Sequence, residues 1–166
     1  MAMEIGVLAR QNHQIGVQLE LRANRALAGE QLTGCQAQVL LYILRHEDSG
    51  ASLTAIHHAY GYSKASLSGL IKQLREKGYV RVEPCREDDR RKLLYGTEKG
   101  RQLLEAMHAA DLKAQDWLQQ TFTPAELTAL EHLQGKLLRS LIQLNTSNPK
   151  KEASAYAKSD ASTQAV

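Results

Sequence analysis

Residues 63–97 read SKASLSGLIKQLREKGYVRVEPCREDDRRKLLYGT, and this stretch decides the fold. Ser63 stands at an N-cap position and Gly78 at a C′ position, so a helix is expected between them. Apolar residues recur at helical spacing within it, at Leu67, Leu70, Ile71 and Leu74. After the glycine, Val80 and Val82 alternate with charged residues, which predicts a half-buried strand.

The second half of the stretch predicts a hairpin. Residues 84–92 are too polar to pack and are expected to form its loop, and residues 93–96 form the returning strand. A helix that fits a major groove, followed by a two-stranded wing with arginines at its tip, is typical of a winged helix-turn-helix. We therefore expect a mainly α fold with a small β-hairpin wing, in which residues 31–97 form a DNA-binding domain.

The wing also carries a family resemblance. Asp88-Asp89-Arg90, followed by Leu94 and Thr97, resembles the wing signature of the MarR (multiple-antibiotic-resistance regulator) family of transcription factors. Three further segments resemble the start of that family's second helix, its recognition helix and that helix's exit: residues 32–36, 63–68 and 74–80. Together these motifs extend the resemblance over about residues 4–145.

Two glycines depart from the family pattern. Gly96 stands where the family usually has a buried leucine at the end of the wing. Gly69 stands where the family often has a larger, commonly basic, residue on the DNA-facing side of the helix. A glycine inside a helix costs about 1 kcal/mol relative to alanine.

Charge is concentrated on the same stretch. The chain has a net charge of +3, but residues 61–92 hold nine basic and five acidic residues, so this segment is +4 and the remainder is −1. Contacts between such cations and phosphates release counterions and provide much of the affinity of DNA-binding proteins. An arbitrary cluster of this kind is more often a solvated face, but its coincidence with a wing favours a DNA-binding surface.

We expect a double-stranded DNA target, read as an inverted repeat by two recognition helices of a homodimer. Gln73 can bond adenine with two hydrogen bonds, and Arg90 is expected to enter the minor groove. The resemblance suggests that Asp88 orients Arg90, although a wing-tip turn residue without a partner is an equally good reading. The DNA-binding residues predicted are Ser63, Lys64, Ala65, Ser66, Ser68, Lys72, Gln73, Arg86, Asp88, Arg90, Arg91 and Lys92.

Long amphipathic helices flank the winged domain. They are expected over residues 4–28, from Thr97 to about residue 121, and from Pro124 to about residue 145, where Thr123 and Glu126 complete the sharpest helix-start signal in the chain. They expose more apolar surface than one subunit covers, which predicts dimerisation through residues 1–30 and 98–145. The alternative is a monomeric bundle. Residues 146–166 lack periodicity and are predicted to be a disordered tail.

The resemblance implies a small amphipathic or phenolic effector bound between the dimer helices and the DNA-binding lobe. By position, a pocket for it would be lined by His13, Leu40, Ile43, Leu44, Met107 and Trp117. Plain core packing is the more ordinary reading of each of these residues.

Other chemistry is weakly represented. No Ser/His/Asp arrangement, phosphate-binding glycine loop or HExxH motif is present, so we predict no enzyme activity, no cofactor and no metal. Cys35, near a helix N-terminus that lowers a thiol pKa, could be a redox sensor, although an inert buried thiol is more common. Cys85 in the wing is expected to be an ordinary exposed thiol.

The sequence thus predicts a ligand-responsive repressor. Two alternatives stay open: a winged-helix adaptor that binds proteins and no operator, for which Gly69 is the only hint, and a thiol-based redox regulator. The N-terminus has no signal-peptide pattern, and no apolar run approaches the length of a membrane helix, which predicts a cytoplasmic protein without membrane contact.

Overall fold

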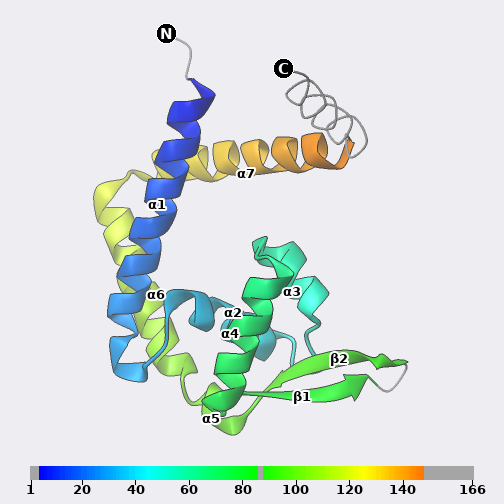
Figure 1. The fold of residues 1–166 in the computed structure, drawn as a ribbon. Coiled ribbons are helices and arrows are strands. Elements are labelled where there is room, and N and C mark those ends of the chain that lie inside the picture. Colours follow the sequence, from blue (N-terminus) through cyan, green and yellow to red (C-terminus); the bar gives the residue numbers. More distant parts are fainter. Residues whose placement is uncertain (1–3, 86–87, 148–166) are drawn as a thin grey trace, which may run out of the picture. The chain divides into compact units, whose positions relative to one another are not determined.

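The computed structural model describes residues 4–85 and 88–147, with all side chains in these ranges except those of residues 89, 90 and 147. The described residues are mostly helical, with one antiparallel hairpin (Figure 1). The elements in chain order are α1 (Ile5–Ala26), the short 3₁₀ helix η1 (Ala28–Glu30), α2 (Gly34–Arg45), α3 (Leu53–Tyr60), α4 (Lys64–Glu76), β1 (Val80–Cys85), β2 (Asp88–Gly96), α5 (Glu98–Arg101), α6 (Leu104–Thr121) and α7 (Pro124–Ser147). This confirms the predicted fold class.

The chain divides within α6 into two compact units, one on each side of the Ala114–Gln115 bond. The first unit contains the winged-helix elements and the second contains the end of α6 and all of α7. A dimerisation region is defined by its contacts with a second copy of the chain. The predicted division into a DNA-binding domain and a dimerisation region therefore stays a prediction.

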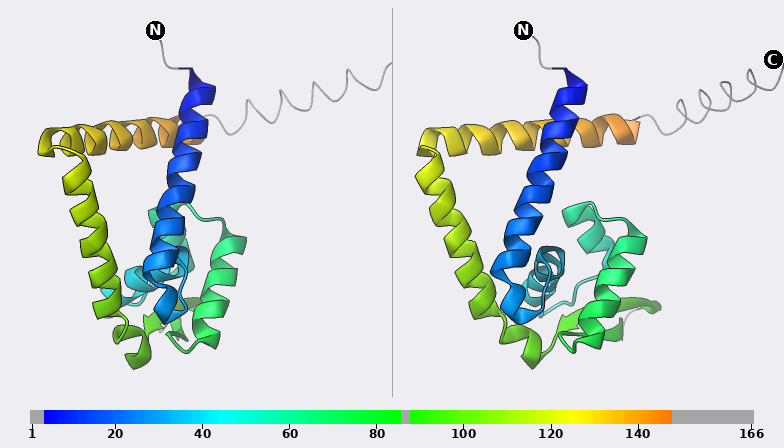
Figure 2. Two further views of the ribbon diagram at one scale, coloured as in Figure 1. Left: turned by 90° about the vertical axis from the view of Figure 1, so that its left-hand side faces the viewer. Right: turned by 60° about the vertical axis from the view of Figure 1, so that its left-hand side comes forward.

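The core of the first unit lies where α2, α4 and the base of the hairpin meet, an arrangement visible in both views of Figure 2. Six side chains in it are shielded completely from solvent, and they come from three helices: Val39, Leu40, Ile43, Ile56, Leu67 and Leu74. Burying side chains of this size stabilises a fold by about 1.5–3 kcal/mol each. This core fixes α4 against α2.

The helix ends follow the sequence signals. Thr33 and Gln36, which stand three residues apart at the start of α2, form a capping box, with each side chain accepting from the other residue's backbone N–H at 3.2 Å. Gly61 and Gly78 end their helices with φ of +73° and +77°, the left-handed backbone that glycine adopts without strain. Thr123 caps α7, as predicted.

Two predicted boundaries were wrong. The helix expected from Thr97 to residue 121 is interrupted at Gln102 and Leu103, where the Leu103 N–H bonds to the Gly100 carbonyl three residues back, and α6 starts afterwards. The stretch expected to be a loop, residues 84–92, is largely paired strand, with Pro84 opposite Lys92 and a bulge after Pro84. Polar residues form a two-stranded ribbon readily, because both of its edges and much of its surface face water.

Burial is low along α3 and differs from expectation at Cys85. Leu53 and Tyr60 are each 38% exposed, because α3 is short and turns only Ile56 into the core. Cys85, expected to be an exposed thiol, is buried at the end of β1. None of the described helices is long and apolar enough to cross a bilayer.

Candidate nucleic-acid interface

Helix α4 is amphipathic, with a buried side and a solvent side. Leu67, Ile71 and Leu74 are buried and pack into the core, while Ser63 caps the helix by accepting a hydrogen bond from the Ser66 N–H at 3.1 Å. The α4 residues predicted to face DNA are all exposed, namely Ser63, Lys64, Ala65, Ser66, Ser68, Lys72 and Gln73. The helix therefore offers one continuous solvent-facing surface to a partner.

The polar groups on that surface are partly engaged within the helix. The Ser63 and Ser66 hydroxyls lie 2.9 Å apart, and the Ser68 hydroxyl donates to the Lys64 carbonyl at 2.9 Å. Lys72 and Glu76 pair at 3.9 Å, with side chains 75% and 63% exposed. An ion pair this exposed contributes little to stability, so the Lys72 ammonium can exchange its partner for a phosphate at small cost.

Gly69 lies in the middle of this surface. A Cβ built at Gly69 meets no atom within 4 Å, so the helix is open to solvent there. The absence of a side chain leaves the backbone of α4 accessible, and it removes the basic contact that the family pattern places at this position.

The wing is attached to the helical core by a third chain segment. Ala51 forms a bridge with Leu94 of β2 through two hydrogen bonds of 2.9 and 2.8 Å. On the hairpin, the Arg81 guanidinium lies 4.7 Å from the centroid of the Tyr95 ring and pairs with Glu83. The Ala51–Leu94 bridge thus holds β2 against the segment that precedes α3, and the Arg81 contacts join residues within the hairpin.

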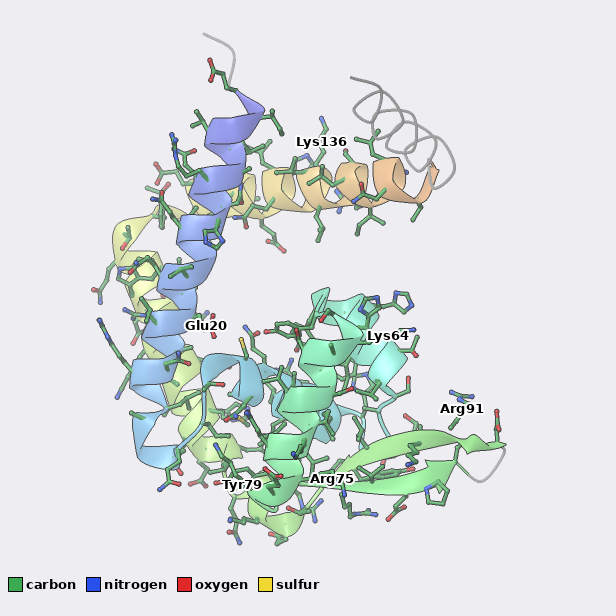
Figure 3. All side chains as sticks on the ribbon, in the orientation of Figure 1. Glu20, Lys64, Arg75, Tyr79, Arg91 and Lys136 are labelled. Carbon is green, nitrogen blue, oxygen red and sulfur yellow. The ribbon has the colours of Figure 1, made fainter. Side chains whose placement is uncertain are left out.

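The wing residues predicted to contact DNA are described to different extents. Arg91 and Lys92 are exposed on β2, and Figure 3 shows Arg91 projecting near the tip of the wing, away from Arg75 at the base. Asp88 is half-buried and interacts with other groups. Arg86 and the Arg90 side chain lie outside the described residues, so the predicted pairing of Asp88 with Arg90 stays a prediction.

A groove of about 870 Å³ runs along the same wing, between β1–β2 and the loop before α3. It is lined by His46, Asp48, Ser49, Gly50, Ser52, Ala55, Glu83, Pro84, Cys85, Arg91, Leu93 and Tyr95. The lining mixes carboxylates with cations, so it has no strong preference for one charge.

Gln36 has a role that was not predicted from the sequence. It is a buried polar residue, 4% exposed, and besides its part in the capping box its Nε2 donates to Gln73 Oε1 at 2.6 Å while its Oε1 accepts from Lys77 Nζ at 3.1 Å. Lys77 is the C-cap of α4. The T-x-x-Q pattern of a capping box indicates the bond to Thr33, but no sequence pattern indicates the bonds to Gln73 and Lys77.

The residues predicted to line an effector pocket are not gathered at a described cavity. Leu40, Ile43, Leu44 and Met107 belong to the core of the first unit. His13 is exposed on α1, and Trp117 lies in the second unit. The core packing that we named as the ordinary reading accounts for the first four.

Cys35 differs from the reactive thiol that its helix position suggested. Its Sγ donates to Glu20 Oε1 at 3.2 Å. Burial, followed by the interaction with the Glu20 carboxylate, raises the pKa of Cys35, and only a hydrogen bond from Tyr62 acts in the lowering direction. Because the thiolate is the reactive form, this environment disfavours a reactive Cys35, and the redox reading stays a prediction.

Comparison with known proteins agrees with this geometry. The model of the MarR family matches residues 30–91, from the end of η1 to the wing. The chain is similar to the crystal structure of MarR, with 20% sequence identity and a TM-score of 0.70 over 89% of this chain and 99% of that one. It is also similar to the Staphylococcus aureus MepR–DNA complex, with 22% identity and a TM-score of 0.72 over 83% of this chain and 96% of MepR. For the transcriptional regulator SlyA the identity is 19% and the TM-score 0.72, over 81% of this chain and 93% of SlyA. A search of curated proteins gave no match.

The fold and the surface define a winged-helix protein with a groove-sized helix and a cationic wing. The MarR family model matches this winged-helix part of the chain, residues 30–91, and that is the family that the wing motifs resembled.

Proposed function

We propose that this protein is a transcription regulator that binds an inverted-repeat DNA operator as a homodimer. The observation that carries the proposal is the solvent-facing surface of α4, which holds the exposed Lys64 and Lys72 next to a wing with exposed Arg91 and Lys92. The charge excess of residues 61–92 is centred on these same elements. A surface of this kind binds the phosphate backbone, while the helix reaches the base edges.

One of the similar folds supports the proposal directly. The S. aureus MepR structure was solved as a complex with DNA, and it shares 22% of its residues with this chain at a TM-score of 0.72. At that identity the likeness concerns the fold. Carrying DNA binding over to this chain is part of the proposal.

The long helices support the homodimer. Large apolar side chains are exposed on α1, on α6 and on α7: Ile5, Ile15, Val17, Leu19, Leu21, Leu112, Trp117, Leu130, Leu133, Leu138, Leu141, Ile142 and Leu144. Contiguous exposed apolar surface on a soluble protein usually marks an interaction site. A second copy of the chain supplies a matching surface, and a two-fold dimer presents two recognition helices to one duplex.

Repression and its release by a small amphipathic or phenolic effector are part of the proposal, and their support is the family resemblance. An effector would act by favouring one separation of the two recognition helices over another. Arg90 and Arg86 are proposed as further wing contacts on the same ground, with Arg90 in the minor groove.

The experiment measures binding of the full chain to DNA selected from a random pool, as a function of salt concentration. Lys72→Ala is expected to weaken binding and to reduce the slope of log K against log salt by about 1, as for one lost phosphate contact. Lys136→Ala removes an exposed lysine from α7 and is the control, with unchanged slope expected. If the parent chain selects no DNA, or if both variants bind as the parent does, the proposed function is wrong.

A further inference from the structure

Gln36 ties the start of α2 to the end of the recognition helix. Its side-chain oxygen accepts from the Thr33 N–H at 3.2 Å and from the Lys77 ammonium at 3.1 Å. Its side-chain nitrogen donates to Gln73 Oε1 at 2.6 Å. Gln36 is 4% exposed, so none of these bonds is readily replaced by water.

The groups that meet the Gln36 side-chain oxygen determine which atom donates and which accepts in each of these hydrogen bonds. A backbone N–H and an ammonium can only donate, so the Gln36 atom that faces them must be the oxygen. Its NH₂ group then faces Gln73, and the Gln73 atom that meets it must accept. Of the two ends of the Gln73 amide, the oxygen is therefore held inward by Gln36.

We propose that Gln36 acts as a positioning residue for DNA recognition by setting the orientation of the Gln73 amide, so that Gln73 presents N–H donors to the base edges. The inference rests on the proposed function. Gln73 is exposed on α4, so its NH₂ group faces the partner side once the oxygen is engaged.

This orientation determines which base Gln73 reads. Two-bond recognition of adenine needs the glutamine oxygen for N6 and the nitrogen for N7, and here the oxygen is already bonded to Gln36. Guanine offers N7 and O6 as acceptors, and thymine offers O4. Adenine keeps N7 as an acceptor but loses the second bond, and cytosine offers only a donor, so Gln73 is proposed to favour guanine or thymine and to disfavour cytosine most strongly.

The Gln36→Glu variant is expected to reverse the orientation of the Gln73 amide while residue 73 stays a glutamine. Glutamate is a natural capping-box residue at this helix position and pairs with Lys77, so the variant keeps both contacts of the original oxygen. A carboxylate cannot donate, so Gln73 must turn its NH₂ group inward and its oxygen outward. An outward oxygen accepts from adenine N6 or cytosine N4.

The test starts from a DNA sequence that the parent chain selects from a random pool. Duplexes carrying each of the four base pairs at every position of one half-site are then compared for the parent and for Gln36→Glu. At one position the parent should favour guanine or thymine over cytosine by about fivefold, and the variant should favour adenine or cytosine over guanine and thymine. The other positions should not change.

Two controls separate positioning from folding. In a Gln73→Ala background, Gln36→Glu should no longer alter base preference, because the residue through which it acts is absent. Gln36→Met frees the Gln73 amide and should reduce the discrimination at that position to less than about twofold, which keeps the test available if the charged variant does not fold.

The outcomes are distinct. If the parent binds selected DNA but Gln36→Glu lowers affinity equally for all four base pairs, or leaves it unchanged, the inference is wrong while the proposed function stands. If the change in preference persists with Gln73→Ala, Gln36 acts through another residue and the inference is also wrong. Failure of the parent to select any sequence refutes the proposed function itself.

Discussion

A matched pair of glycine substitutions tests the packing with opposite expected signs. Gly69 lies within α4, where an added Cβ meets nothing within 4 Å, so Gly69→Ala gains the helix propensity of alanine and stabilises the fold by about 1 kcal/mol. Gly100 lies in α5, where an added Cβ would stand 2.5 Å from the Tyr79 carbonyl oxygen. That backbone must move, and overpacking of this kind costs about 1–3 kcal/mol.

The assay is thermal and urea denaturation at one protein concentration, because a dimer's stability depends on concentration. Gly69→Ala should raise the melting temperature by about 3 °C, and Gly100→Ala should lower it by a similar amount or more. The same methyl group is added in both variants, so the signs depend only on what surrounds it. If Gly100→Ala is neutral or stabilising, the close approach of α5 to the start of β1 is wrong.

Three further outcomes are expected. Gly96→Ala should destabilise the fold by about 1–3 kcal/mol in urea denaturation, because its Cβ would stand 2.2 Å from Leu44 Cδ2, and the companion change Leu44→Ala should reduce that penalty. Hydrogen bonds from the Thr123 backbone and side chain lower the pKa of Glu126. The carboxylate therefore stabilises the fold fully above the ordinary pKa of 4.5, and this stabilisation is lost as pH falls through the lowered pKa. Glu126→Gln should remove this part of the pH dependence of stability. Burial and Glu20 raise the pKa of Cys35, so iodoacetamide should alkylate Cys35 more slowly at pH 8 than it alkylates free cysteine, and Glu20→Gln should speed the reaction.

The fold was predictable wherever a local signal decided it. Thr123, Pro124 and Glu126 fix the start of α7 by short-range chemistry alone, and the alternating valines of β1 depend only on one buried face. The break before α6 was not predictable in the same way. It occurs where Leu103 is buried against the core, and the sequence shows an unbroken helical pattern there.

The site was predictable as a surface and unpredictable in its contacts. The exposed side of α4 follows from helical periodicity, because Leu67, Ile71 and Leu74 must face inward together. The bond between Gln36 and Gln73 joins residues 37 positions apart, and it depends on how α2 crosses α4. Tertiary contacts of this kind set the chemistry that the surface presents.

Gly96 shows how packing compensates for a departure from a family pattern. The family usually places a buried leucine at this position, and glycine supplies no side chain there. The Leu44 side chain reaches that space from α2, with Cδ2 too close to the position of a Cβ at residue 96 for both to be present without a shift. The volume is thus supplied by another residue.

The central claim is that α4 and the wing form a single DNA-binding surface and that two copies of it grip one duplex. Native mass spectrometry on selected DNA, combined with binding to a duplex carrying an insertion of about five base pairs between the half-sites, tests it most directly. We predict two chains per duplex and at least a tenfold loss of affinity on insertion, because half a helical turn moves one half-site to the opposite side of the DNA. One chain per duplex, with affinity unchanged by the insertion, would contradict the account.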